Sequence, residues 1–189
     1  MQNRQQVGGG KEPTGTINIS ENGSYNVKNY AEANVNIPND FNVKAGISNP
    51  TTGNTFKDFI TEITNINIGS LTLLTSFFTQ YSNLKSVELF DTSNVTSMTY
   101  MFYRNLNLED VPLFNTSKVT SMLDIFTDCS KLTDASLNNI LAMAANSIVT
   151  TTANKKISKL GLSQAQAVRC RTLSNYQAFI NAGWVDDLQ

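Results

Sequence analysis

The sequence predicts an α+β fold in which a short solenoid of 24-residue repeats lies between a small N-terminal β-meander and a helical C-terminal cap. Three features support this class: a motif that recurs at a fixed interval, an Asn-Gly turn between alternating runs, and helix signals after the last repeat. The predicted parts are a flexible arm at 1–14, the meander at 15–38, a linker at 39–55, the solenoid at 56–140 and the cap at 141–189.

The repeat recurs at an interval of 24 residues. The first full copy, from Ser76, reads SFFTQYSNLKSVELFDTSNVTSM; the second, from Tyr100, reads YMFYRNLNLEDVPLFNTSKVTSM; the third, from Asp124, begins DIFTDCSKLTDASLNNI. A degraded copy at 56–74 precedes them, which gives about four turns. Because so short a repeat cannot bury its own apolar side, each copy must cover the next in an elongated stack. The matching apolar positions are Phe78, Phe102 and Phe126; Leu84, Leu108 and Leu132; Val87, Val111 and Ala135; Leu89, Leu113 and Leu137; and Phe90 and Phe114.

Each repeat divides into a strand, a corner and a short helix. The runs LKSVEL and LEDVPL suit a short strand whose Leu, Val and Leu side chains face inward. An Asp or Asn side chain then starts a turn, and the following Thr or Ser can cap a short helix with apolar side chains. Strand, corner and helix in each 24 residues is the plan of leucine-rich repeats. In the first full copy these residues are Leu84, Val87 and Leu89; Asp91; Thr96 or Ser97; and Met98, Met101 and Phe102.

The region before the repeats predicts a meander of three strands. Apolar and polar residues alternate at 17–20, an Asn22-Gly23 turn follows, and the alternation resumes at 25–27. Asn-Gly between alternating runs is the strongest short-range signal of a hairpin, because a type I′ turn needs positive φ at both central residues. A third strand at 33–37 stops at Pro38. Since so small a meander is marginal alone, it must pack on the solenoid, on a copy of itself or on another protein.

Helix signals replace the repeat after residue 138. The run at 139–145 is rich in alanine, Ser163 precedes QAQAVRC, and Ser174 precedes NYQAFINAG, in which Gly183 can end the helix. A terminal unit that differs from the repeats is expected, because the last turn leaves an apolar face that must be covered.

Trp184 and the two cysteines are the isolated side chains of interest. Trp184 is predicted to pack with Phe179 on the last turn, with a ligand-binding role as the alternative. Cys129 and Cys170 have no CxxC spacing and cannot alone form a zinc site. Cys129 falls at the repeat position of Tyr81, which predicts a small buried side chain in a turn. Whether the two cysteines form a disulfide stays open.

Composition argues against several classes of function. Charged residues are 15% of the chain and the net charge is −1, whereas nucleic-acid binding needs a dense Lys/Arg face; the basic residues at 155–171 suit a solvated helix face. The chain has no histidine, and its 15 acids show no paired arrangement, so we expect no enzyme, no catalytic residue, no cofactor and no metal site. No apolar run approaches the roughly 20 residues of a membrane span, and no signal peptide is expected.

The segments FDTSNVTSMTYMF at 90–102 and FNTSKVTSMLDIF at 114–126 resemble the repeats of BspA-like leucine-rich-repeat bacterial surface proteins. The motif of that group runs roughly F-D-T-S-x-V-T-x-M-x-x-M-F. The second copy departs from it with Asn115 for Asp and with Leu-Asp-Ile at 123–125. The resemblance spans about half of the chain. It implies a surface-associated protein, from bacteria or mobile elements, that acts in adhesion rather than catalysis.

The flanking segments narrow this resemblance. The segment GTINISENGSYNVKNYAEANVNIP at 15–38 resembles a short module of tail and other virion proteins in phages of Gram-positive bacteria. The segments KLGLSQAQA and LSNYQAFINAGW within 159–184 resemble the C-terminal cap that such phage proteins place after these repeats. A phage structural protein leaves the cell by lysis, which agrees with a surface-type repeat without an export signal.

Together these features predict a non-enzymatic phage virion structural protein of the tail, baseplate or head fibre type. It would assemble in the host cytoplasm and be released by lysis. The N-terminal arm would bind other virion proteins, and the repeats would bind a host-surface glycan or protein or decorate the particle. Trimer formation would cover the edges of the meander. The alternatives are a phage-encoded intracellular inhibitor of a host protein and a bacterial surface adhesin.

The binding surface is weakly marked in the sequence. The outward strand positions are mildly acidic and lack the aromatic platform of a strong anchor. The candidate binding residues are therefore Tyr81, Tyr100, Tyr103 and Arg104, on the turns or the helical side; packing between turns is the alternative for the tyrosines. The outward strand positions are Ser86, Glu88, Asp110, Pro112, Asp134 and Ser136.

Overall fold

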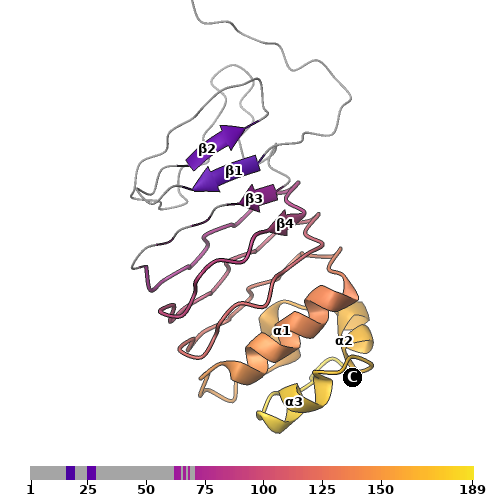
Figure 1. The fold of residues 1–189 in the computed structure, drawn as a ribbon. Helices are drawn as coiled ribbons and strands as arrows, with labels where there is room; N and C mark the ends of the chain where they lie inside the picture. Colours follow the sequence, from indigo (N-terminus) through magenta and orange to yellow (C-terminus); the bar gives the residue numbers. More distant parts are fainter. Residues whose placement is uncertain (1–15, 20–24, 29–61, 65, 67, 69–70) are drawn as a thin grey trace, which may run out of the picture.

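The computed structural model describes residues 16–19, 25–28, 62–64, 66, 68 and 71–189. Turns of chain stacked side by side lie between the short strands and the C-terminal helices (Figure 1). The predicted arm, linker and third meander strand lie outside the described residues. In chain order the elements are β1 (Thr16–Ile19), β2 (Tyr25–Lys28), β3 (Glu62–Thr64), β4 (Ser86–Val87), α1 (Asp134–Asn146), the 3₁₀ helix η2 (Ile157–Leu160), α2 (Gln164–Cys170) and α3 (Tyr176–Asn181).

A small sheet begins the fold, with the strand order β2-β1-β3-β4. β1 and β2 pair antiparallel, with Ile17 opposite Val27, which confirms the first two strands of the predicted meander. β1 also pairs in parallel with β3, where Ile17 lies opposite Ile63, and β3 pairs in parallel with β4, where Ile63 lies opposite Val87. The sequence left three packing partners open for the meander: the repeats, a copy of itself or another protein. The structure shows the first of these, because β1 pairs with β3 in the first repeat.

Beyond these strands, successive turns of chain are joined backbone to backbone at the interval of the repeat. Parallel bridges link Leu73 to Ser97 and Ser97 to Ser121. A further bridge links Ser86 to Asp110, although only Ser86–Val87 is long enough to form a strand. The strands predicted from LKSVEL and LEDVPL are thus reduced to two residues in the first copy and to a single bridge in the second.

The short helices predicted around Met98-Phe102 and Met122-Phe126 are absent, because both segments are tight turns. Alternate N–H groups, those of Met98, Tyr100 and Phe102, donate to carbonyl oxygens of the next turn at 2.9–3.0 Å. The N–H groups of Met101 and Tyr103 close i→i−3 turns instead. Since the bonds between turns use donors that a helix would need, apolar residues at helical spacing are buried here without a helix.

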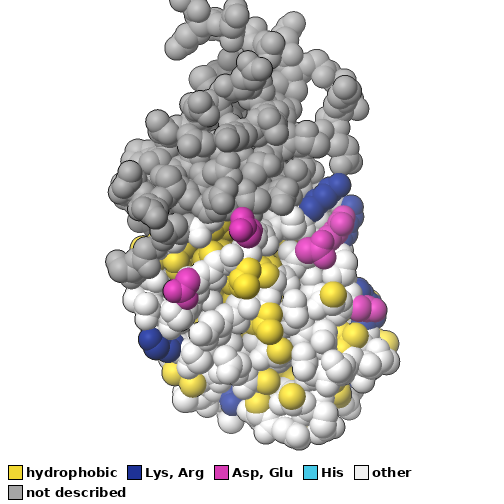
Figure 2. Space-filling view, viewed as in Figure 1, with side chains coloured by type: hydrophobic (Ala, Val, Ile, Leu, Met, Phe, Trp, Pro, Cys, Tyr) yellow, Lys and Arg dark blue, Asp and Glu magenta, His cyan; other side chains and the backbone are white. Residues whose placement is uncertain are grey.

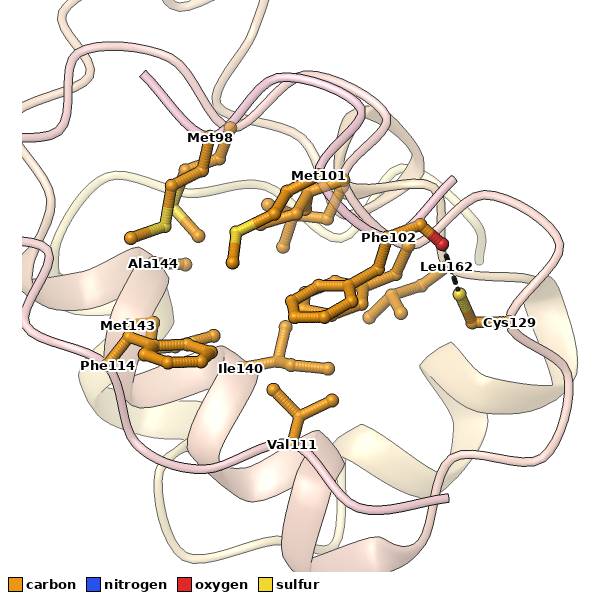
Figure 3. Close-up of a cluster of buried hydrophobic side chains, with 14 of the residues drawn as sticks. Met98, Met101, Phe102, Val111, Phe114, Cys129, Ile140, Met143, Ala144 and Leu162 are labelled. Atoms are coloured by element: carbon orange, nitrogen blue, oxygen red, sulfur yellow. Dashed lines mark hydrogen bonds between the residues drawn. The ribbon is translucent and has the colours of Figure 1, made fainter. Parts of the chain in front are cut away.

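Three phenylalanines one repeat apart form the centre of the core. Phe78, Phe102 and Phe126 are fully buried, and their ring centroids are 5.5 and 5.6 Å apart in two stacked pairs. In Figure 3, Phe102 lies among Met101, Ile140 and other buried side chains from the turns and from α1. The leucine column Leu84, Leu108 and Leu132 is buried as well.

The inward direction predicted for the second leucine of each strand is wrong. Leu89 and Leu113 are 58% and 53% exposed, whereas the adjacent Phe90 and Phe114 are buried. The strand ends at Val87, so the alternation that would bring the next leucine inward does not continue. The phenylalanines fill the core instead, with their ring centroids 5.0 Å apart.

Helix α1 covers the last turn and replaces the strand of the third copy. Ser136, predicted to face outward, is buried: its Oγ accepts from Val111 N at 2.9 Å and donates to Glu109 O at 2.8 Å. Thr116 Oγ1 donates to Met143 O at 2.6 Å. Helix α1 thus forms hydrogen bonds with backbone and side-chain groups of the turn that it covers. Because α1 begins at Asp134, the predicted division between residues 140 and 141 lies inside this helix.

The remaining cap follows the predicted helix signals in part. Ser163 caps α2 in a full capping box with Gln166, as the sequence predicts. Helix α3 begins after Asn175 rather than after Ser174. Trp184 is buried, stacks on Phe179 at 5.4 Å and donates its Nε1–H to Ala144 O at 2.9 Å. The predicted packing role of Trp184 is therefore confirmed, and the ligand-binding alternative is wrong.

Both cysteines are free and buried, which settles the question of their pairing. Burial raises the pKa of Cys129 and of Cys170 to about 12. The Cys129 thiol lies 3.0 Å from Phe102 O, as the dashed line in Figure 3 shows. Because the thiolate is the reactive form, we expect a chromogenic disulfide reagent to label neither thiol quickly in native buffer and both in guanidinium. Rapid labelling of the native protein would contradict this.

Asp186 connects the end of the chain to α2 and α3. Its buried carboxylate accepts from Arg171 Nε at 2.7 Å and from the Tyr176 hydroxyl at 3.0 Å. The bond from Arg171 is the main cause that lowers the pKa of Asp186. A carboxyl whose pKa is lowered by folding adds stability above its unfolded pKa of about 3.9, and this stability is lost as the pH falls through the folded pKa.

Asp186→Asn should therefore lower the urea midpoint of unfolding at pH 7, because the charged partner of Arg171 is lost. The difference from the wild type should begin to shrink as the pH falls below about 4, where the carboxyl of the unfolded chain becomes protonated, and should become small once the pH has fallen through the lower pKa of the folded carboxyl. Urea titrations of both proteins from neutral to acidic pH test this. A difference that stays constant over the whole range would mean that Asp186 is not the group that titrates.

Candidate functional site

An open cleft of about 520 Å³ lies where three successive turns present equivalent residues. Ser76, Tyr100 and Asp124 stand one repeat apart, and Thr127 stands one repeat after Tyr103. The middle turn contributes both aromatic rings, and the two outer turns contribute hydroxyl groups and a carboxylate. We call this the tyrosine cleft; it is lined by Ser76, Tyr100, Tyr103, Asp124 and Thr127.

The backbone of the tyrosine cleft is held in an unusual conformation. Ser76, Tyr100 and Asp124 all have left-handed φ, of 58°, 56° and 51°. Their N–H groups each donate to the carbonyl oxygen of a neighbouring layer at 2.7–2.9 Å. For residues other than glycine, asparagine and aspartate this conformation costs roughly 1–2 kcal/mol. The bonds between layers therefore hold a side chain such as that of Tyr100 at a position where the local backbone does not favour it.

The two tyrosines form an edge-to-face pair. Their ring centroids are 5.6 Å apart and their planes meet at 82°. Tyr100 is 36% exposed, and Tyr103 is half-buried. The Arg104 guanidinium lies 5.3 Å from the Tyr103 centroid, and its Nε lies 3.4 Å from Asp128 Oδ2. Since both charged groups are about half exposed, this ion pair contributes little to stability and serves to position the arginine.

The structure brings three of the four predicted binding residues together and removes the fourth. Tyr81 is only 3% exposed, and burial raises its pKa. Its N–H donates to Asn105 Oδ1 at 2.8 Å, and its ring meets Phe78 edge-on at 6.2 Å. Tyr81 is therefore a packing residue and not part of an exposed site. Tyr100 and Tyr103 line the cleft, and Arg104 lies beside Tyr103.

Sequence reasoning missed the polar members of the cleft. Ser76, Asp124 and Thr127 line it although none was a candidate. The register of the repeat holds the signal: Ser76 and Asp124 stand at the position of Tyr100 in the neighbouring copies. Examining the residues 24 positions before and after each candidate tyrosine would have identified all three.

A second cleft adjoins the tyrosine cleft where the last turn meets the cap. Its volume is about 410 Å³, and it shares Asp124 and Thr127 with the first. Gly161 makes this junction possible, because a Cβ there would lie 2.7 Å from Thr127 Cα. The other polar residues that line this second cleft are Asp128, Ser130, Ser158, Ser163 and Gln166.

The two arginines of the C-terminal basic stretch pair with carboxylates. Arg169 pairs with Asp134 at 2.6 Å, and Arg171 pairs with Asp186 at 2.7 Å. On the face shown in Figure 2, charged side chains are scattered and both signs are mixed. Among the described residues there is no group of three potential metal ligands, and none of their helices is long and apolar enough to cross a membrane.

The two clefts combine aromatic rings, carboxylates, hydroxyls and an amide on a backbone fixed by bonds between layers. This chemistry suits reversible binding by stacking and hydrogen bonding.

A family model described as "Mycoplasma protein of unknown function, DUF285" matches residues 48–166, well over half of the chain. The match covers the repeats and the tyrosine cleft and ends in the first turn of α2. No curated protein and no solved structure matches the chain.

Proposed function

The chain belongs to the DUF285 family of Mycoplasma proteins of unknown function, and from that premise we propose that it is a non-enzymatic protein that displays a binding surface. The stacked turns would form a short leucine-rich-repeat-like solenoid of the BspA-like type, closed by the helical cap. The convergence of equivalent residues from three successive turns on one open cleft carries this proposal. The absence of histidine from the sequence supports a binding role over catalysis.

We propose further that this display takes place on a phage virion, as a tail, baseplate or head fibre protein. The resemblance of residues 15–38 and 159–184 to segments of phage virion proteins supports this placement. The pairing of β1 with β3 adds a mechanical reason, because it would join a docking module to the repeats through a continuous sheet. The arm would bind other virion proteins, and trimer formation would cover the edges of the meander.

Peptide mass spectrometry on purified phage particles from a lysate of the source strain tests the virion role. Many copies of the chain per particle are expected, and the copy number separates capsid decoration from a tail-tip component. If the chain is missing from particles but abundant in the infected cell, the virion role is overturned and an intracellular inhibitor becomes the leading explanation.

A bacterial surface adhesin is the second candidate. One observation favours it: the family description names Mycoplasma, a cellular bacterium, and not a phage. The same display of a binding surface would then serve the cell. Protease shaving of intact, phage-free cells, followed by mass spectrometry of the released peptides, separates the two. Peptides of this chain in the shaved fraction would favour the adhesin.

A further inference from the structure

We propose that the tyrosine cleft binds a neutral sugar ring and that the adjoining cleft receives the next units of the same oligosaccharide. This inference rests on the proposed function, the display of a binding surface, and it names the class of ligand that this surface binds. It follows from the geometry of the aromatic pair, from the charges around it and from the continuity of the two clefts.

The aromatic pair offers a surface that fits a sugar ring. Tyr100 and Tyr103 lie at 82° to each other, so one ring presents its face where the other presents its edge. The C–H groups on one side of a pyranose carry partial positive charge and suit the negative face of a tyrosine ring. Tyrosine gives this contact with few rotatable bonds and keeps a hydroxyl for hydrogen bonding. The cleft volume of about 520 Å³ lies in the range of small-ligand sites.

The polar groups around the pair match the hydroxyls of a sugar. Asp124 supplies acceptors, and Ser76 and Thr127 can both donate and accept. Thr127 Oγ1 lies 3.5 Å from Asp124 Oδ1, a weak contact that a ligand hydroxyl can replace. A sugar hydroxyl that donates to the carboxylate and accepts from the threonine would satisfy both groups.

The charges argue for a neutral ligand. Asp124 lies in both clefts, and Asp128 lies in the second. Arg104, the cation nearest to the tyrosine pair among the contacts described above, already lies over Tyr103 and pairs with Asp128. A sulfated, phosphorylated or sialylated glycan would place its charge beside these carboxylates, and like charges repel at this range. A free cationic ligand would compete with Arg104 for the Tyr103 ring.

Continuity of the clefts argues for an oligosaccharide rather than a single sugar. Asp124 and Thr127 belong to both clefts, so a chain of linked sugars can run from the tyrosine pair toward the cap. The second cleft adds further hydrogen-bonding groups, from Ser130, Ser158 and Gln166. Polar contacts there would orient the units that follow the stacked ring.

The backbone at Tyr100 provides a variant that removes the ring without harming the fold. Tyr100 has a left-handed φ of 56°, which asparagine tolerates better than tyrosine. Tyr100→Asn should therefore keep the melting temperature at or near the wild-type value while it deletes the stacking surface. Gln80→Asn is the matched control, because Gln80 has a φ of 63° and does not line the tyrosine cleft.

The test is saturation-transfer NMR and titration calorimetry of the full chain with chitotetraose, maltotetraose and cellotetraose at millimolar concentration. Sialyllactose and a heparin tetrasaccharide are the anionic counterparts. We expect at least one neutral oligosaccharide to bind, with saturation of its ring protons, and the anionic ones to bind about tenfold more weakly or not at all. Tyr100→Asn should weaken binding at least about tenfold, and Gln80→Asn should leave it unchanged.

Three results would overturn the inference: no binding of any neutral oligosaccharide, stronger binding of the anionic ones, or full affinity in Tyr100→Asn with a wild-type melting temperature. These results leave the display function standing, since the detection of the chain in particles or on cells is a separate measurement. A chain that binds sugar but is missing from both particles and cell surfaces would overturn the display function and keep the cleft assignment.

Discussion

Phe102→Ala is expected to lower the free energy of unfolding by about 3–5 kcal/mol. Phe102 is fully buried and stacks on Phe78 and Phe126 at 5.5 and 5.6 Å and on Phe114 at 6.3 Å, so its removal breaks three ring contacts at once. The neighbouring turns are tied to each other by backbone hydrogen bonds, which limits how far they can close around the cavity. Urea or guanidinium denaturation followed by circular dichroism measures the effect.

Leu113→Ala is the control for this prediction. Leu113 stands in the next part of the same repeat but is 53% exposed, so its truncation should change the stability by no more than about 0.5 kcal/mol. Equal losses for the two variants would mean that the phenylalanine column does not carry the core. A loss below about 1 kcal/mol for Phe102→Ala would lead to the same conclusion.

The columns of the repeat were the most predictable feature of the chain. Residues 24 apart that share an apolar type must lie over one another if successive copies stack, and Phe78, Phe102 and Phe126 do so. The α2 cap was also predictable, because Ser163 and Gln166 form a local motif that does not depend on the rest of the fold.

The conformation within each turn could not be predicted from the same pattern. Met98, Met101 and Phe102 have the spacing of one helix face, yet their segment is a turn. A helix and a layered turn both bury residues three and four apart, and the choice depends on whether N–H groups bond within the segment or to the next layer. Here the N–H groups bond to the neighbouring copies of the repeat. A pattern read within one short segment carries no information about those copies.

The candidate site was predictable only in its aromatic part. Tyr100 and Tyr103 stand out by type, whereas Asp124 and Thr127 enter the cleft only as the residues that stand 24 positions after them. Tyr81 has the same residue type but lies at a buried position of the repeat. Residue type identified the chemistry, and only the arrangement of the layers distinguished a surface tyrosine from a core one.

The junction between cap and repeats was invisible in the sequence, because its contacts do not follow the period. Asp124 and Phe126 donate their N–H groups to Lys159 O and Leu160 O at 2.7 and 2.9 Å, so η2 takes the place of a further turn. Gly161 follows directly, with φ of 81° and its backbone against Thr127. The next layer thus comes from residues about 35 positions away, where a 24-residue register does not point.

Gly161→Ala should lower the free energy of unfolding by about 2–5 kcal/mol, since two penalties combine at this position. Alanine is disfavoured by about 1–2 kcal/mol at a left-handed φ, and forcing an extra carbon into a packed site costs about 1–3 kcal/mol. The new Cβ would collide with the backbone N and the Oγ1 of Thr127 and would lie 2.7 Å from its Cα. The bonds from Asp124 N and Phe126 N to Lys159 O and Leu160 O resist a movement of the two backbones apart. Thermal and guanidinium unfolding measure the loss.

Gly183→Ala separates the two penalties. Gly183 has nearly the same φ, 84°, but a Cβ there would meet only Lys155 Nζ, at 3.7 Å, which is an ordinary contact at the end of a flexible side chain. This variant should lose only the roughly 1–2 kcal/mol of the backbone penalty. If the two variants lose the same amount, the close approach of Gly161 to Thr127 contributes nothing. A larger loss at Gly161 would show that the fold requires this close approach of the two backbones, and the same variant should then also disturb the second cleft, which both residues line.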